Sequence, residues 1–240
     1  MKNLIFFLPS FSYYGAGNST LRLCKTLDKK KYQISIISLG KNFQKSKLKK
    51  IGCKIFEINS NNVFRSMKLI IPLVNKIYEA KMQKNIFISS IHHANVFSII
   101  FLRTIKNLKI IGIERTDINE LLIFDNLFNY IKNLLIYLLV KIYYKKADLI
   151  ISNSIRGKND LIKLCKTKVL NIPSPSFLSL KFKKPLKKIK KLKIISVGRL
   201  SKEKGYDVII KALSKLQIKD FSLTILGDGP EKENLKVMIK

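Results

Sequence analysis

Short apolar segments alternate with longer amphipathic ones along residues 1–165. The short segments are rich in β-branched residues and bounded by polar ones, which is typical of buried strands. They cover 3–8, 34–39, 54–58, 86–91, 109–113 and 148–152. Apolar residues recur at helical spacing over 17–30, 44–51, 63–84, 95–106, 119–146 and 155–165. Because the strands are apolar throughout, this α/β alternation predicts a parallel sheet with helices on both faces.

The pattern changes over 171–191, where prolines and serines are followed by dense lysine. This composition is typical of a linker between domains. Afterwards the alternation resumes, with strands at 192–198 and 221–227, a helix from Tyr206 to Leu216 and a helix that opens at Pro230 or Glu231. Two strands do not make a stable independent domain. We therefore predict a Rossmann-like domain over 1–170, a linker over 171–191 and the start of a second, incomplete Rossmann-like domain over 192–240.

The chain carries 47 Lys and Arg against 15 Asp and Glu, a formal net charge of +32. The lysines are scattered through every segment, and arginine, whose fork reads bases, is scarce. We therefore expect no nucleic-acid partner. Attraction to an anionic membrane surface stays open, and codon bias is the alternative explanation of the charge.

The longest other apolar run, 134–140, is far shorter than the roughly 20 residues of a spanning helix. The apolar run at the start, Leu4 to Leu8, is too short for a signal peptide. Cys24, Cys53 and Cys165 have no metal-site spacing, which indicates reduced thiols. We expect a cytoplasmic protein without a metal or other cofactor, peripheral at the inner membrane face if it binds lipid.

The stretch SVGRLSKEKGYDVIIKAL (196–213) joins a strand end, a turn and a helix start. Ligands of open α/β sheets sit at the carboxyl ends of strands. Gly198 lets the backbone approach a ligand, and Arg199 and Lys204 can converge on one anion such as a diphosphate. The alternative is a surface turn whose charged side chains are merely solvated.

This stretch, followed by LTILGDGPEKENLK (223–236), resembles the retaining glycosyltransferases of family 4, which have the GT-B fold. The similarity extends along the chain through ADLIISNS (147–154) and the linker. It implies a UDP- or GDP-sugar donor whose diphosphate is held by Arg199 and Lys204. It also implies that Gly227 and Gly229 approach the nucleotide, although Asp-Gly-Pro alone would be an ordinary turn.

The resemblance implies further site residues in the first domain. Gly15 and Gly17, in PSFSYYGAGNS (9–19), match the first glycine loop, which faces donor and acceptor. His92 or His93, in SSIHHANVFS (89–98), would be catalytic near the transferred sugar, and His92 is favoured. The alternatives are a simple turn for the glycines and packing at a helix start for the histidines.

IGIERTDINE (111–120) resembles a turn of family members that build bacterial surface polysaccharides. It implies that Arg115 binds a phosphate of the donor or of a lipid-linked acceptor. A structural pair between Glu114 and Arg115 is the alternative. The segment 127–148 mixes aromatic, aliphatic and lysine residues. A helix packed in the core is favoured there over contact with a membrane surface.

The family's Glu-x7-Glu motif does not follow Gly229, because the only later acidic residues are Glu231 and Glu233. We expect a glycosyltransferase that acts with retention on a hydroxyl of a glycan or lipid-linked acceptor, in surface polysaccharide or lipopolysaccharide synthesis. We also expect residues 1–240 alone to be inactive. The alternatives are a non-catalytic subunit that needs a partner chain and, ranked lower, a nucleotide-sugar epimerase of the same fold.

Overall fold

A computed structural model describes residues 2–11, 15–78, 84–124, 126–175, 192–217 and 220–239. The chain divides into two compact units, Met1–Leu180 and Lys181–Lys240, which are described separately. The division falls inside the range 171–191 that the sequence predicts as a linker, of which 176–191 lies outside the described residues.

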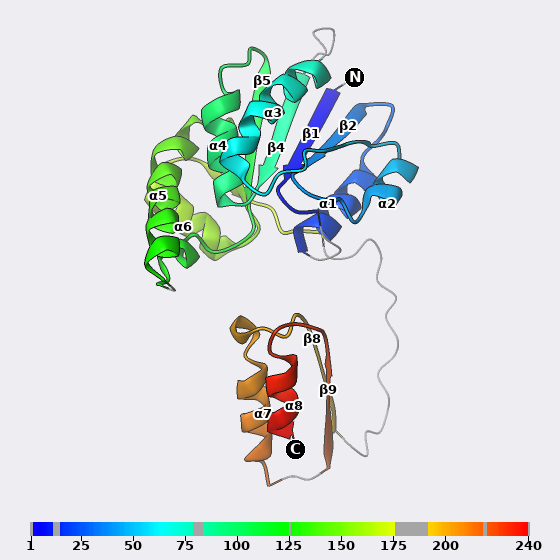
Figure 1. The fold of residues 1–240 in the computed structure, drawn as a ribbon, viewed down its shortest axis with the longest axis vertical. Helices are drawn as coiled ribbons and strands as arrows, with labels where there is room; N and C mark the ends of the chain where they lie inside the picture. Colours follow the sequence, from blue (N-terminus) through cyan, green and yellow to red (C-terminus); the bar gives the residue numbers. More distant parts are fainter. Residues whose placement is uncertain are drawn as a thin grey trace. The chain divides into compact units, whose positions relative to one another are not determined.

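The first unit is built on a seven-stranded sheet in the order β3-β2-β1-β4-β5-β6-β7 (Figure 1). All six strand pairings are parallel, which confirms the predicted fold class. The strands are β1 (Lys2–Leu8), β2 (Tyr32–Ser38), β3 (Lys54–Glu57), β4 (Lys84–Ser90), β5 (Leu108–Glu114), β6 (Leu149–Ser152) and β7 (Val169–Asn171). The sequence pattern missed β7, because three residues are too few to show a periodicity.

Helices connect these strands. They are α1 (Gly15–Thr26), α2 (Lys45–Lys50), α3 (Val63–Ile77), α4 (His92–Leu102), α5 (Leu127–Tyr143) and α6 (Ile155–Cys165), with the short 3-10 helices η1 (Ile118–Leu122) and η2 (Tyr144–Lys146). The predicted helix 119–146 is thus divided. Its break has a local cause, because the Asn126 side chain accepts a hydrogen bond from the Asn129 amide and so caps α5. The predicted helix 63–84 ends at Ile77, and α4 begins at His92 rather than at residue 95.

Both faces of the sheet are buried, as the apolar strands predicted. Successive side chains of a strand point to opposite faces. Phe6 packs in one cluster with Cys24 of α1 and Leu48 of α2, while Phe7 packs in another with Ile70 of α3. Burying a side chain of this size stabilises the fold by roughly 1.5–3 kcal/mol. The two clusters therefore fix the register that brings the carboxyl ends of the strands to one edge.

The second unit has two parallel strands, β8 (Leu192–Val197) and β9 (Phe221–Leu226), with α7 (Tyr206–Ser214), α8 (Lys232–Ile239) and the 3-10 helix η3 (Lys202–Lys204). Its small core joins Leu200, Tyr206, Ile210 and Leu235. The strands of this sheet expose several apolar side chains, and Val197 is 74% exposed. Among the described residues, one face of this sheet is therefore uncovered.

Candidate functional site

The strand order of the first unit reverses beside β1, whose neighbours are β2 and β4. A reversal of this kind opens a crevice at the carboxyl edge of the sheet, where ligands of open α/β sheets bind. The predicted residues Gly15, Gly17, His92, His93 and Arg115 all follow the carboxyl ends of β1, β4 or β5. The fold thus brings to one edge the residues that the sequence singled out in this unit.

Arg115 joins several elements at this edge. Its guanidinium donates from Nε to the Ser90 hydroxyl at 3.4 Å and from Nη2 to the Thr20 hydroxyl at 3.4 Å. Its Nη1 donates to the hydroxyls of Ser19 and, at 3.2 Å, Ser174. These partners come from α1, the end of β4 and the segment after β7, so that Arg115 is held in one orientation by four hydroxyl groups.

The positive charge of Arg115 has no carboxylate partner among the described residues. Its side chain is half-buried, and burial lowers the pKa of the guanidinium. An arginine nevertheless stays charged near neutral pH. A partly desolvated cation with neutral partners suits a phosphate, which an arginine fork can grip in two places. The alternative pair of Glu114 with Arg115 does not form.

Glu114 instead contacts His92. The Nδ1 atom of His92 lies 2.5 Å from Oε2 of Glu114, and the two side chains are only 6% and 1% exposed. The other ring nitrogen, Nε2, lies 3.0 Å from the Thr116 hydroxyl. Burial by itself lowers the pKa of His92, but the Glu114 carboxylate, with smaller contributions from Glu120 and the Asp117 backbone, raises it by more, so the pKa is raised overall. His92 is thus protonated to a larger extent near neutral pH than a free imidazole.

A buried network holds the Glu114 carboxylate. Its Oε1 accepts hydrogen bonds from the Tyr144 hydroxyl and, at 2.7 Å, from the side-chain amide nitrogen Nδ2 of Asn95. The side-chain oxygen Oδ1 of Asn95 accepts in turn a hydrogen bond from the Ser89 hydroxyl at 2.7 Å. The sequence reading did not identify Asn95 or Tyr144. The available signal was Glu114 itself, because a carboxylate that ends an apolar strand is buried only when it has partners.

The turn that presents His92 is strained. Ile91 stands between β4 and α4 with a φ of 85°, a conformation that β-branched residues rarely adopt. Its backbone amide donates to the Ile113 backbone carbonyl at 3.2 Å, and its backbone carbonyl accepts from the Asn95 backbone amide at 2.9 Å. Strain of this kind costs on the order of 1–3 kcal/mol and is concentrated at functional sites. Here it lets α4 begin at His92, immediately after the strand.

His93 has a different environment. It is half-buried, and its pKa is lowered by burial first, then by His92 and by Lys132 of α5. The neighbouring histidines therefore have pKa values displaced in opposite directions. His92 is therefore the better proton donor of the two and His93 the better proton acceptor. The catalytic role of either residue stays a prediction.

The two predicted glycines of the first unit lie in the first turn of α1. Gly15 has a φ of 50°, in the left-handed region that favours glycine, and a Cβ there would meet open space. Gly17 is buried. Residues 12–14, in the same loop, lie outside the described residues. The loop is placed at the carboxyl end of β1, and its contact with a ligand stays a prediction.

In the second unit, the glycine turns at 198–200 and 227–229 lie against each other. The Gly198 amide donates to the Leu226 carbonyl at 3.0 Å, and the Leu200 amide donates to the Asp228 carbonyl at 3.0 Å. A Cβ on Gly227 would lie 1.8 Å from the Gly198 oxygen, and one on Gly229 would lie 2.3 Å from the Leu200 oxygen. Backbone packing between the turns therefore requires both glycines. The sequence analysis predicted contact with the nucleotide for these glycines and did not predict this packing role.

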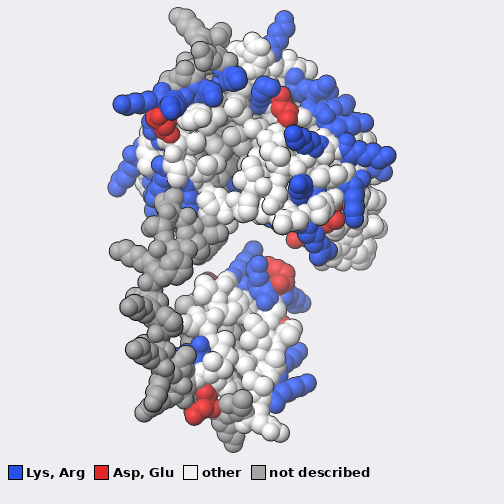
Figure 2. Space-filling model, turned by 180° about the vertical axis from the view of Figure 1, so that it is seen from behind, with Lys and Arg blue, Asp and Glu red and all other residues white. Residues whose placement is uncertain are grey.

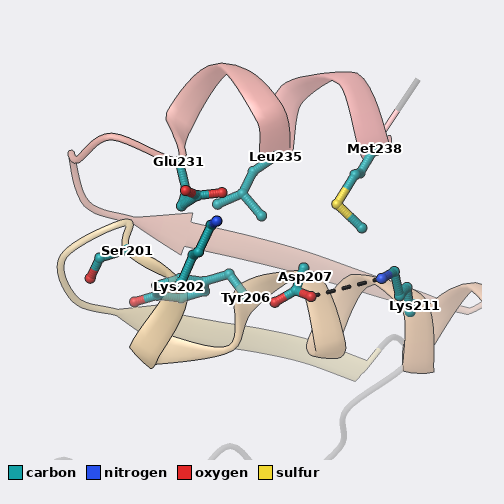
Figure 3. Close-up of a pocket in the computed structure, with 8 residues that line it drawn as sticks. All are labelled: Ser201, Lys202, Tyr206, Asp207, Lys211, Glu231, Leu235 and Met238. Atoms are coloured by element: carbon teal, nitrogen blue, oxygen red, sulfur yellow. Dashed lines mark ion pairs between the residues drawn. The ribbon is translucent and has the colours of Figure 1, made fainter. Parts of the chain in front are cut away.

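Arg199 lies in the first of these turns and Lys204 at the end of η3, and both side chains are exposed. Neither forms an ion pair with another described residue. Beside them, a cavity of ≈ 360 Å³ lies between the turn after β8, α7 and α8 (Figure 3). Its lining is Ser201, Lys202, Tyr206, Asp207, Lys211, Glu231, Leu235 and Met238. None of the predicted donor residues lines this cavity.

Cys24, Cys53 and Cys165 are free and buried. In the described part of the chain, no three His, Cys, Asp or Glu side chains gather as a metal site would require. In the same part of the chain, no helix has the length and apolar character needed to cross a membrane. Residues 2–8, the apolar start, form β1, an interior strand of the sheet between β2 and β4.

Comparisons with known proteins agree with this architecture. Residues 179–240 match the family "Glycosyl transferases group 1". An uncharacterized glycosyltransferase of Haemophilus influenzae is 26% identical over 246 residues, covering 100% of this chain and 66% of the relative. The N-acetylgalactosamine-N,N'-diacetylbacillosaminyl-diphospho-undecaprenol 4-alpha-N-acetylgalactosaminyltransferase of Campylobacter jejuni is 36% identical over 107 residues, which are 42% of this chain and 29% of the relative.

Among solved structures, the lipopolysaccharide outer core galactosyltransferase WaaB in its apo form superposes with a TM-score of 0.67 at 14% identity. The superposition covers 99% of this chain and 64% of that one. The chain thus spans about two thirds of the length of the relatives that it matches along its whole extent. Its fold is that of the GT-B glycosyltransferases, and its last 62 residues match the group 1 family.

Proposed function

We propose that the protein is a glycosyltransferase of family 4 that transfers a sugar from a UDP- or GDP-sugar to a hydroxyl group with retention of anomeric configuration. The observation that carries this proposal is the family match over 179–240, which contains the turn with Arg199 and Lys204. Both side chains are exposed and have no ion-pair partner among the described residues, so that they are free to bind a diphosphate.

In the proposed reaction, the bond between the anomeric carbon and the diphosphate oxygen breaks, and a bond to the acceptor oxygen forms on the same face. The acceptor proton passes to the leaving diphosphate, so no separate base is required. Arg199 and Lys204 stabilise the charge that develops on this leaving group. No metal ion or other cofactor enters the proposal.

The acceptor proposed is a glycan, free or linked to lipid phosphate, in surface polysaccharide or lipopolysaccharide synthesis. Two relatives support this choice. The Campylobacter protein acts on a diphospho-undecaprenol-linked sugar, and WaaB is a lipopolysaccharide outer core enzyme, as their names state. Arg115, whose charge lacks a carboxylate partner among the described residues, is proposed to hold the acceptor phosphate. Such a reaction would take place at the cytoplasmic face of the inner membrane.

A second candidate is a non-catalytic subunit that acts only with a partner chain. The observation that favours it is the uncovered face of the β8–β9 sheet, where Ile195 and Val197 are exposed. Gel filtration with a candidate partner polypeptide separates the two cases, because a subunit would elute as a complex and a free enzyme would not.

A transfer assay tests the proposal. The purified chain is incubated with UDP- and GDP-sugars and a lipid-linked glycan, and NMR of the product gives the anomeric configuration. Each charge-assisted contact contributes roughly 1.5–3 kcal/mol, so residues 1–240, which carry no Glu-x7-Glu after Gly229, are expected to show no transfer. Any transfer that is detected should disappear in Arg199→Ala. An inverted product, or transfer that Arg199→Ala leaves intact, would refute the proposal. Lys215→Ala, on an exposed lysine of the same unit, is the control.

A further inference from the structure

Helix α5 exposes a continuous apolar stripe. The exposed positions recur every three or four residues, so they share one face of the helix. They are Leu127, Phe128, Ile131, Leu135, Leu138 and Ile142, preceded by Leu122, Ile123 and Phe124. Phe128 is 79% exposed and Leu127 is 66% exposed. We call these nine residues the α5 stripe.

The opposite face of the helix already has partners. Ile136 and Val140 are buried in the core of the first unit. An ordinary surface helix turns a polar face to water, whereas α5 is apolar on both sides. The predicted packing of this helix in the core is confirmed for Ile136 and Val140, and the exposed apolar face is an additional feature of the helix. A contiguous exposed apolar patch marks an interaction surface.

Lysines border the stripe. At 3.6 residues per turn, the α5 part of the stripe spans about 100° of the helix surface, and Lys132 and Lys141 fall about 40° beyond its opposite edges. Lys145 and Lys146 follow in η2. The sequence 122–146 contains these four lysines and one acidic residue, Asp125, which gives 4 − 1 = +3. Figure 2 shows lysine and arginine also spread over one face of the first unit, with few acidic side chains.

This charge decides between the partners that an apolar stripe could have. A second copy of the chain would bring two surfaces of the same sign together, which opposes association. An anionic bilayer offers hydrocarbon for the stripe and phosphates for the lysines. With 17 residues, α5 is about 25 Å long, so it lies along a bilayer surface and does not cross the bilayer.

We propose that the α5 stripe docks on an anionic lipid surface, with its apolar side chains among the lipid headgroups and Lys132 and Lys141 at the lipid phosphates.

The position of α5 links this surface to the candidate site. The segment 115–126 runs from the end of β5, where Arg115 lies, through η1 to the start of α5. Thr116 of this segment contacts His92, and Lys132 lies close enough to His93 to lower its pKa. A docked bilayer would therefore lie beside the carboxyl edge of the sheet. Docking through α5 would bring a lipid-linked acceptor to this edge of the sheet, a step that rests on the proposed function.

Vesicle flotation with the full chain tests the apolar part. Phosphatidylcholine vesicles are compared with and without phosphatidylglycerol, in the absence of any sugar. We expect binding to the anionic vesicles, and a loss of at least about tenfold in affinity in Phe128→Ser/Ile131→Ser/Leu135→Ser. Leu69→Ser/Ile155→Ser/Ile172→Ser, at similarly exposed positions of the same unit, should bind within about twofold of the wild type. Circular dichroism verifies that both triple variants are folded.

A second pair of variants tests the charge. A lysine near an anionic surface contributes roughly a factor of five, so Lys132→Gln/Lys141→Gln should weaken binding roughly 5- to 30-fold. Lys49→Gln/Lys50→Gln, on the exposed face of α2, should weaken it less.

Three outcomes would overturn the inference. In the first, the wild type does not bind anionic vesicles. In the second, the stripe variant binds them as well as the wild type does. In the third, vesicles do not bind and sedimentation velocity shows a dimer that the stripe variant abolishes. Because no sugar transfer is measured, failure here leaves the proposed reaction standing. Intact vesicle binding, together with nucleotide binding that Arg199→Ala/Lys204→Ala leaves unchanged, would refute only the proposed function.

Discussion

His92 and Glu114 form a buried ion pair at the carboxyl edge of the sheet, with Nδ1 and Oε2 2.5 Å apart. Tyr144 and Asn95 orient the carboxylate, and Thr116 contacts the other ring nitrogen of His92. The imidazole is therefore fixed on both sides. The Glu114 carboxylate stabilises the protonated form of His92, although burial of the pair opposes the charged form.

Replacing Glu114 with Gln should lower the pKa of His92, because burial then acts without the opposing carboxylate. An NMR titration of the imidazole Cε1 protons measures this directly. The His93 signal is followed in the same titration, and its pKa should rise slightly in Glu114→Gln, because the charge of His92 contributes to lowering it. An unchanged His92 pKa in Glu114→Gln would contradict the account of the pair.

The same pair makes stability depend on pH. The folded-state pKa of His92 lies above the unfolded value of about 6.5. Its contribution to the free energy of unfolding is thus complete below pH about 6.5 and is lost as pH rises through the folded pKa. His93, whose pKa is lowered, acts in the opposite sense. The measurement is therefore the difference in urea stability between wild type and His92→Gln, which should shrink with rising pH. A difference that grows with pH would contradict it.

Arg115→Ala should weaken binding of inorganic diphosphate roughly 10-fold or more, because a charge-assisted contact contributes about 1.5–3 kcal/mol. Arg115→Lys should restore only part of the affinity, since lysine lacks the fork. Calorimetric titration measures both. The control is Arg103→Ala, at an exposed position. Equal binding by the Arg115 and Arg103 variants would remove Arg115 from the proposed phosphate site.

Gly227→Ala and Gly229→Ala should each destabilise the second unit by roughly 1–3 kcal/mol or more, because the new Cβ meets a backbone oxygen that has little room to move. Thermal unfolding measures the change. Gly40→Ala, where a Cβ meets nothing within 4 Å, is the matched control. If all three variants melt alike, the two turns do not pack as described.

The sequence predicted the sheet well because its strands are apolar on both faces and therefore stand out from their surroundings. It missed β7, which has three residues, and the break before α5, which depends on the Asn126 cap. The contacts of Arg115 could not be predicted from the sequence for another reason. Ser19 is 96 residues away along the chain, and only the strand order brings its hydroxyl to the guanidinium.

The outward face of α5 shows the same limit. Apolar spacing alone does not distinguish a helix that is covered on both sides from one that is covered only along Ile136 and Val140. The residue types of the donor turn were readable from the sequence, whereas the packing of Gly227 and Gly229 against the Gly198–Leu200 backbone was not.

The central claim is that Arg199 and Lys204 bind the diphosphate of a nucleotide donor. The most direct measurement is calorimetric titration of UDP and GDP into the full chain, the Arg199→Ala/Lys204→Ala variant and the Lys215→Ala control. We expect weak binding of one nucleotide by the wild type and the control, and a loss of roughly 100-fold or more in the double variant. Equal binding by the double variant and the wild type would contradict the claim.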